Sequence, residues 1–228
     1  AQLTDNGSGT RRITAQGTAT GLSIGNAQVD PLLAGQTTFD LAATQSPAGI
    51  AIERLIARNG QLQVTTSGNP RDGLDVDASL SNLALLVPGI PGPATATGTV
   101  RQEPGGIILD VAATAPGGTR AQIAGRVATD GGDSDLRISG VSDAAIANPF
   151  LRVRSVEGPV SFDLRLAGPP ALESLTGTVN LNGARLSDPN LGLSIDPLQA
   201  TANLQNGLVN LDVRGTVGAG GENTYNLL

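Results

Sequence analysis

The 228-residue chain contains no Cys, His, Met, Trp or Lys, and it has only one Tyr and three Phe. Without Cys it can form neither a disulfide nor a thiolate site, so cysteine usage gives no indication of the redox compartment. Without His or Lys, the usual bases of serine hydrolases and the lysine of the phosphate-binding loop are missing. The sequence therefore predicts a protein that is not an enzyme and that has no cofactor and no catalytic metal.

Two motifs with a chemical meaning occur, and neither is complete. Gly21-Leu22-Ser23-Ile24-Gly25 fits the nucleophile elbow of serine hydrolases, but its serine has no histidine to take the proton. The oxygen-rich run Asp130–Leu136 is similar to a calcium-binding loop, yet no glutamate closes it and the run occurs only once. A strand turn and a polar hairpin turn are the simpler interpretations.

The absence of Met predicts that the chain is a piece of a longer protein, because it does not include an initiator residue. No stretch approaches the roughly 18–20 apolar residues of a membrane-spanning helix, so any membrane anchor is expected outside this chain. The formal net charge is −6 and the basic residues are scattered. This charge argues against nucleic acid and against an anionic lipid surface as partners, and it favours an apolar or protein partner.

Short stretches of alternating apolar and polar residues fill most of the chain, which also contains 31 Gly. In Val209–Arg214 the two kinds alternate with period two, directly after Asn206-Gly207, a dipeptide that favours a tight turn. Gly73–Leu80 alternates in the same way, with Leu, Val and Ala opposed by Asp and Ser. Such alternation predicts strands with one apolar and one polar face, so we expect an all-β fold.

Turn dipeptides predict where further strands end. The strand that contains Val179 is expected to end at Asn182-Gly183, and the strand that contains Leu193 is expected to end at Asp196-Pro197. Both dipeptides are typical of turns because Asn and Gly tolerate left-handed backbone conformations and Pro cannot continue a ladder. A series of short antiparallel strands is therefore expected here.

Two segments are predicted to be single helical turns inside long loops. They are Asp143–Asn148, with Ser142 as the expected cap and Pro149 as the expected stop, and Ser81–Val87. Each is too short to be stable by itself. We therefore interpret both as plugs or lids inside long loops.

Several elements recur along the chain. GGTRAQIAGRVA at Gly117–Ala128 parallels GSGTRRITAQGTA at Gly7–Ala19, and a glycine turn precedes a strand at Asn59-Gly60, Gly105-Gly106 and Asn206-Gly207. Such loose periods indicate a degenerate repeat array. The alternative is a coincidence of the turn residues that are common in any glycine-rich β protein.

Residues 1–228 are expected to form a single elongated array of β repeats, with possible hinges at the Pro/Gly-rich segments 88–93 and 168–170. An open, curled sheet would expose its apolar faces as a trough, which on a soluble protein normally indicates a ligand or partner. A closed β-sandwich or a β-solenoid would instead bury these faces. Periodicity alone does not choose between these architectures.

The residues expected to line such a trough are aliphatic or aromatic members of the period-two strands. They are Val64, Val76, Leu109, Phe162, Leu164, Val179, Leu193, Val209, Leu211 and Val213. We expect them to contact an apolar or protein partner. The competing interpretation is a structural β-solenoid or adhesin stalk that has no ligand channel.

A longer pattern also points to a family. GTVNLNGARLSDPNLGLSIDPLQATANLQNGLVNLDVRGTVGAGG at Gly177–Gly221 resembles the C-terminal region of the TamB family of translocation and assembly module proteins, which are relatives of the AsmA-like proteins. VEGPVSFDLRLAG at Val156–Gly168 and the Gly117–Ala128 segment are similar too, so the resemblance covers most of the chain. The family contributes no catalytic residues.

The resemblance implies a β-taco, which is an elongated curled sheet with a hydrophobic interior, in the periplasm of a Gram-negative envelope. It implies that the full-length protein is anchored in the inner membrane and acts with an Omp85-type outer-membrane barrel. The implied roles are assistance to outer-membrane protein insertion, as in protein secretion, and lipid transport between the two membranes. The expected anchor helix is not present in this chain.

Overall fold

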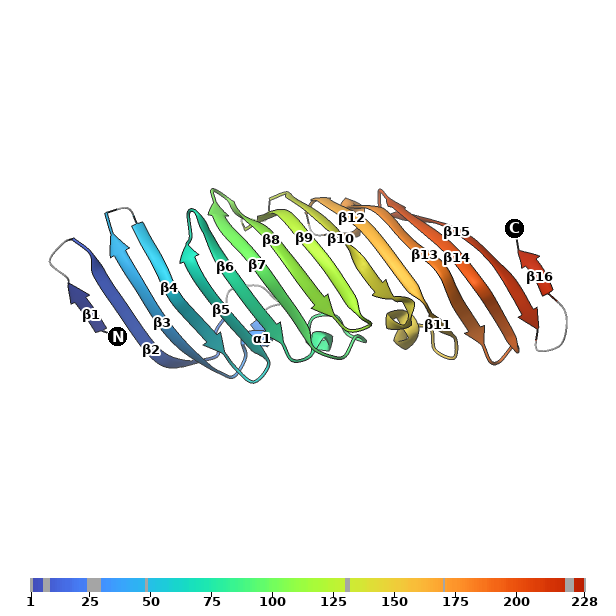
Figure 1. The fold of residues 1–228 in the computed structure, drawn as a ribbon, viewed down its shortest axis with the longest axis horizontal. Coiled ribbons are helices and arrows are strands. Elements are labelled where there is room, and N and C mark those ends of the chain that lie inside the picture. Colours follow the sequence, from blue (N-terminus) through green and yellow to red (C-terminus); the bar gives the residue numbers. More distant parts are fainter. Residues whose placement is uncertain are drawn as a thin grey trace. The chain divides into compact units, whose positions relative to one another are not determined.

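The protein is described by a computed structural model that covers residues 2–5, 9–23, 30–47, 49–129, 132–169, 171–219 and 224–227. The chain divides into two compact units, Ala1–Ala113 and Thr114–Leu228. The division falls within strand β8 (Gly106–Ala115). Both units consist almost entirely of antiparallel strands (Figure 1), so the predicted all-β class is confirmed.

The described residues of the first unit form seven further strands, each following the last along the chain. They are β1 (Gln2–Asp5), β2 (Arg11–Thr20), β3 (Gln36–Ser46), β4 (Gly49–Arg58), β5 (Leu62–Asn69), β6 (Gly73–Leu80) and β7 (Ala94–Glu103). Each of these strands pairs antiparallel with its neighbours in sequence. Two short helices interrupt the series, α1 (Asp30–Leu33) and the 3-10 helix η1 (Leu83–Leu85).

The second unit has the same kind of antiparallel series. Its strands are β9 (Thr119–Ala128), β10 (Ser134–Asp143), β11 (Ser155–Glu157), β12 (Pro159–Gly168), β13 (Leu175–Asp188), β14 (Leu193–Gln205), β15 (Leu208–Ala219) and β16 (Thr224–Leu227). The order in the sheet is β9-β10-β12-β13-β14-β15-β16, and β11 pairs with β13. Two 3-10 helices, η2 (Ala144–Phe150) and η3 (Leu172–Ser174), connect strands.

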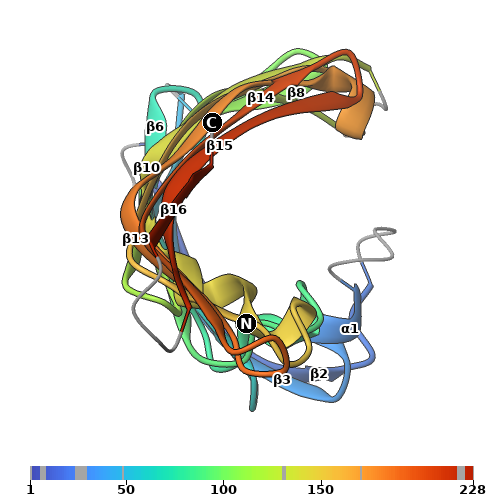
Figure 2. The same cartoon turned by 90° about the vertical axis from the view of Figure 1, so that its right-hand side faces the viewer.

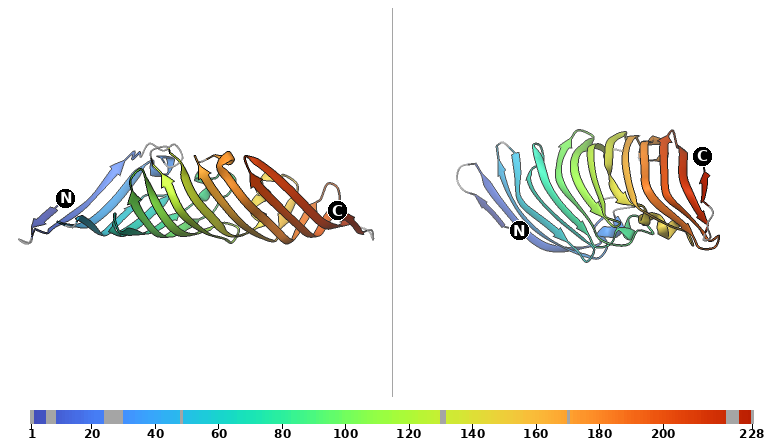
Figure 3. Two further views of the ribbon diagram at one scale, coloured as in Figure 1. Left: turned by 90° about the horizontal axis from the view of Figure 1, so that it is seen from above. Right: turned by 45° about the vertical axis from the view of Figure 1, so that its right-hand side comes forward.

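The sheet of the second unit is open and curled. Its described strands follow one another in a row, and Figure 3 shows strands β9 to β15 side by side. Figure 2 shows strands β13 to β15 following an arc, with η2 on the inner side of that arc. The predicted curled sheet is thus what forms, and the alternative of a closed sandwich is not.

The predicted turns at Asn182-Gly183 and Asp196-Pro197 are wrong. β13 continues through the first dipeptide and β14 continues through the second, and at both places the register between these strands and their neighbours shifts. A β-bulge places an extra residue in one strand, which bends that strand and increases its twist. Turn-forming dipeptides here bend two long strands instead of ending them.

The segment predicted as the helical turn 143–148 is η2, which begins and ends differently from the prediction. Its cap is Asp143, whose side-chain oxygen accepts a hydrogen bond from the Ala145 N–H at 2.8 Å, and the helix continues through Pro149. Ser142, the predicted cap, is not the cap, and its hydroxyl lies 2.7 Å from that of Thr119 instead. The second predicted helical turn, within 81–87, forms as η1 with Asn82 as its cap.

The two proposed hinges lie inside the units and not at their division. Residues 88–93 belong to the first unit, where the Leu83 N–H donates to the Gly92 carbonyl at 2.6 Å. Residues 168–170 belong to the second unit, and Pro170 lies outside the described residues. Hinge motion at either place stays a prediction. None of the helices in the described ranges has the length and apolar character needed to cross a membrane.

Candidate functional site: an apolar sheet face

The strand register of the second unit joins apolar residues from successive strands into one face. Phe162 of β12 lies opposite Val179 of β13, which lies opposite Ala202 of β14, and Ala202 lies opposite Leu211 of β15. Residues that are directly opposite in an antiparallel pair point to the same side of the sheet. A row of apolar side chains therefore crosses four strands without a polar residue.

Parallel rows extend this face in both directions. One row runs Ile123, Ile138, Leu164, Gly177, Leu204 and Val209 across β9, β10, β12, β13, β14 and β15. Another runs Val160, Leu181, Ala200 and Val213 across β12 to β15. We call this surface, together with the row through Phe162 and Leu211, the apolar face of the second unit. Six of the ten residues predicted from the sequence belong to these three rows.

One end of the apolar face is covered by a loop. Ala144 of η2 and Val156 of β11 form a buried cluster with Ala184 and Leu198, and Val160 packs against it. Ala184 is fully buried and Leu198 is 5% exposed. The bulges of β13 and β14 lie at these two residues, so the bent strands wrap around the loop. Residues 144–157 therefore cover this end of the face, and we call them the plug.

Polar contacts hold this plug in place. The Asn148 side-chain oxygen accepts a hydrogen bond from the Val156 N–H at 2.7 Å. The Arg154 guanidinium contacts the Asp188 carboxylate at 2.7 Å, and that carboxylate is mostly buried. The hydrogen bond from Arg154, supported by the backbone N–H groups of Leu191 and Asn190, lowers the pKa of Asp188 below its usual range against the opposing effect of desolvation.

The other end of the apolar face is open to solvent. Val209, Leu211 and Val213 on β15 are 55%, 65% and 44% exposed, although the polar residues between them occupy the opposite face. Exposed leucines are common on protein surfaces, but three consecutive period-two aliphatic residues on one strand are a contiguous patch. The face is therefore buried under the plug at one end and available to a ligand at the other.

Glycine allows two strands to approach closely in the middle of the face. Gly177 has φ +127°, and a Cβ added to it would overlap the carbonyl oxygen of Asp163 on the neighbouring strand. Gly140 is similarly enclosed by the Arg120 carbonyl and the ring of Phe162. Only glycine fits such close backbone contacts, which also bend the sheet. The glycine-rich composition thus serves the curvature of the face.

The opposite face of the second unit is polar and carries crossed ion pairs. Arg137 donates two hydrogen bonds to Asp163, at 2.7 and 3.2 Å, and Arg165 donates two to Asp135, both at 2.8 Å. The hydrogen bonds from Arg165 lower the pKa of Asp135, and those to Asp163 raise the pKa of Arg137. An open hollow of about 660 Å³ lies over these groups. Because its charges are paired with each other, the hollow offers no excess charge to a ligand.

The first unit has an apolar face of its own. Val64 of β5 lies opposite Ala78 of β6, and Val76 of β6 lies opposite Thr66 of β5, so both predicted valines point to the same side. The face continues through Phe39 and Gly17 on β3 and β2, where the phenylalanine ring occupies the space that a side chain at Gly17 would need. The buried hydroxyls of Thr37 and Thr66 have no hydrogen-bond partner among the described residues.

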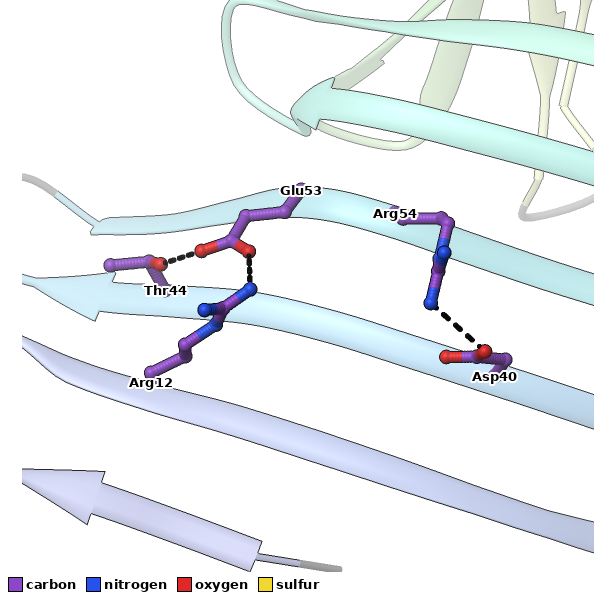
Figure 4. Close-up of polar contacts among 5 residues, drawn as sticks. All are labelled: Arg12, Asp40, Thr44, Glu53 and Arg54. Carbon is purple, nitrogen blue, oxygen red and sulfur yellow. Dashed lines mark hydrogen bonds and ion pairs between the residues drawn. The ribbon is translucent and has the colours of Figure 1, made fainter.

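Charged residues of the first unit lie on its other face. Figure 4 shows Arg12 of β2 beside Glu53 of β4 at 2.5 Å, with the Thr44 hydroxyl donating to the same carboxylate at 2.6 Å. Arg54 contacts Asp40 at 3.0 Å. The hydrogen bond from Thr44, followed by the charge of Arg12, lowers the pKa of Glu53. These exposed pairs connect three strands and keep one face of the sheet hydrated.

Leu193 and Leu109 complete the predicted set. Leu193 is seven residues from Ala200, so strict alternation would place it on the opposite face. The β14 bulge between Ile195 and Leu198 adds one residue, and Leu193 therefore lies on the apolar face, opposite Ala219. Leu109 alternates with exposed Asp110 on β8 and is half-buried. Contact of any of the ten residues with a lipid or a strand stays a prediction. Ile138 and Leu204 belong to the face as well and were not predicted, although their own alternation was the available signal.

The remaining motifs add no chemistry. Ser23 donates to Asp30 at 2.7 Å, and Ile24 and Gly25 of the hydrolase-like motif lie outside the described residues, as do Asp130 and Gly131 of the oxygen-rich run. Over the described ranges, no group of three or more acidic residues is arranged to hold a metal ion.

No protein-family model, no curated protein and no solved structure matches this chain.

Proposed function

We propose that this chain is a non-catalytic hydrophobic-face protein of the TamB type, which works in the periplasm and conducts phospholipid between the inner and outer membranes through its acyl chains. The observation that carries this proposal is the continuous apolar face of the second unit, open at β15 and backed by a polar face. A sheet with these two faces can hold a hydrocarbon chain on one side while its other side stays in water. No nucleophile, base or metal is needed for that role.

The size of the face fits the proposed ligand. Six strands spaced about 4.8 Å apart extend over roughly 24 Å, which exceeds the ~15 Å depth of one hydrocarbon leaflet of a bilayer. Moving a sixteen-carbon tail into water costs on the order of 12 kcal/mol, at about 0.8 kcal/mol per methylene. An uninterrupted apolar surface removes most of that cost. This is why the absence of polar residues from the rows matters more than the shape of any single pocket.

Photo-crosslinking from two adjacent residues tests the proposal. A photoreactive amino acid replaces Val179, which lies on the apolar face, or Asn180, which lies on the polar face of the same strand. We expect covalent capture of phospholipid from the Val179 position in cells and in vesicles, and none from Asn180. Equal capture at both positions, or capture at neither, would contradict the proposal and would favour a structural stalk without a ligand.

The alternative cargo is a strand of an outer-membrane protein, with an Omp85-type barrel as the partner of the full-length complex. That role requires an unpaired sheet edge and not an apolar face. Capture of outer-membrane protein from a photoreactive residue on an edge strand, with no capture of lipid at Val179, would favour this alternative. The apolar rows do not themselves demand a protein strand, so lipid is the cargo that we propose.

A further inference from the structure

Three large apolar side chains are exposed at the rim of the second unit where the plug lies. Phe150 and Val153 of the plug are 58% and 57% exposed, and Leu191, in the turn between β13 and β14, is 63% exposed. Figure 1 shows η2 and this turn at the same rim of the sheet. A single exposed apolar residue is ordinary, but three at one rim form a candidate contact surface.

The Asp188 carboxylate joins the two segments that carry these side chains. One of its oxygens accepts a hydrogen bond from the Arg154 guanidinium at 2.7 Å, and the other accepts from the Leu191 N–H at 3.3 Å. Val153 directly precedes Arg154, so the same carboxylate fixes Val153 and Leu191 beside each other. We call Phe150, Val153 and Leu191 the apolar rim.

Local packing directs the plug's part of the apolar rim outward. Leu151, which lies between Phe150 and Val153, packs against the buried cluster under the plug. The Arg154 N–H donates to the Leu151 carbonyl at 3.2 Å and closes a turn, in which Arg152 has φ +58°. This left-handed conformation is uncommon for a residue other than glycine and is enriched at functional positions. Leu151 thus anchors the turn while its neighbours extend into solvent.

Arg152 adds a positive charge to this surface. It is exposed and has no ion-pair partner among the described residues, whereas the charge of Arg154 is matched by Asp188. The only acidic residue of the plug, Glu157, lies opposite Arg185 of β13. The rim therefore combines apolar side chains with one guanidinium that no described carboxylate pairs.

The surface of a phospholipid bilayer matches this combination. Its phosphate groups lie directly above the acyl chains, so a guanidinium next to apolar side chains can contact both at once. A protein partner matches less well, because three side chains that each expose on the order of 100 Å² fall short of the ~800 Å² that a stable protein interface takes from each partner. A zwitterionic bilayer carries phosphate without a net surface charge, so the net charge of −6 does not oppose the contact.

We propose that the apolar rim enters the interfacial layer of a phospholipid bilayer, with Arg152 on lipid phosphate. The contact is reversible, since three side chains bury too little apolar surface for permanent anchoring. It is separate from transport along the apolar face and does not require it. The contact places the plug end of that face against a membrane.

A single tryptophan reports the contact, because the chain has none of its own. Phe150→Trp is compared with Leu208→Trp, which replaces a leucine that is 68% exposed and follows the turn at the opposite end of β14. With phosphatidylcholine vesicles, the emission of the first variant should shift to shorter wavelength and be quenched by lipids with brominated tails. The emission of the second should do neither. Unchanged emission of the first variant, or equal changes in both, would overturn the proposal.

Flotation of the full chain with the same vesicles measures the binding itself. The triple variant Phe150→Ser, Val153→Ser, Leu191→Ser should weaken binding about tenfold or more, because it removes the apolar contacts. Arg152→Gln should weaken binding several-fold, whereas Arg71→Gln, which removes the same charge from another exposed arginine, should leave it unchanged. Folding of each variant is checked by circular dichroism. Full binding of the triple variant, or equal losses in the two arginine variants, would refute the proposed contact.

Discussion

Leu198 and Leu211 are the same residue type on the same apolar face, yet truncating them to alanine should have very different consequences. Leu198 is 5% exposed and packs in the cluster that η2 and β11 cover, whereas Leu211 is 65% exposed at the open end. Their exposure differs because the plug covers Leu198 and not Leu211, although both residues belong to the same alternating pattern. A comparison of Leu198→Ala with Leu211→Ala therefore measures directly whether the face is closed at one end and open at the other.

The magnitudes follow from burial. Removing a buried leucine side chain costs about 2–5 kcal/mol, including the cavity that it leaves. The neighbours of Leu198 include Ala144 and Ala184, which are too small to fill such a cavity, so we expect about 3 kcal/mol for Leu198→Ala. Folding removes only about a third of the Leu211 surface from water, so Leu211→Ala should cost about 0.5–1 kcal/mol.

Urea unfolding followed by far-ultraviolet circular dichroism is the suitable assay, because the chain has no Trp for fluorescence. The midpoint should fall clearly for Leu198→Ala and barely for Leu211→Ala, with unchanged slopes. Equal losses for the two variants would refute the assignment of covered and open ends.

Three further predictions concern stability. Arg154 holds the pKa of Asp188 below its usual ~3.9, so the ion pair contributes its full stability above about pH 3.9 and loses it as the pH falls through the lowered pKa. Asp188→Asn should therefore reduce the loss of unfolding free energy that accompanies acidification, measured by urea unfolding at a series of pH values. Gly177→Ala should lower the free energy of unfolding by on the order of 2 kcal/mol, because the new Cβ would clash with the Asp163 carbonyl oxygen and φ is positive. The control Gly60→Ala has open space around the new Cβ and should change this free energy by less than about 0.5 kcal/mol in the same urea titration. Thr66→Val should stabilise the fold by about 1 kcal/mol and raise the midpoint of thermal unfolding, because it replaces a buried hydroxyl that has no partner among the described residues by a methyl group of the same shape. A lower midpoint would show that the hydroxyl is satisfied.

The period-two pattern was sufficient to predict the strands and their faces. Gly73–Leu80 forms β6 with the predicted bounds, and Asn206-Gly207 forms the turn that joins β14 to β15. Alternation determines these features because side chains of a pleated strand point to opposite sides whatever the strand pairs with. For the same reason Phe162, Val179 and Leu211, predicted separately from local patterns, lie in one row.

Local pattern failed where the outcome depended on a neighbouring strand. Asn182-Gly183 and Asp196-Pro197 have the residues of turns, but β13 and β14 pair along their whole length and absorb both dipeptides as bulges. The bulge also shifts the phase of the strand, so counting residues from Ala200 would have placed Leu193 on the polar face. Pairing between distant segments, and not the dipeptide itself, decides between a turn and a bulge.

Only the tertiary structure decided which part of the apolar face is buried. In sequence, Leu198 and Leu211 are equivalent apolar positions of equivalent strands. Their burial differs because residues 144–157 fold back over the first and nothing described covers the second. Alternation is a property of each strand alone, whereas cover arises from contacts between segments far apart in the chain.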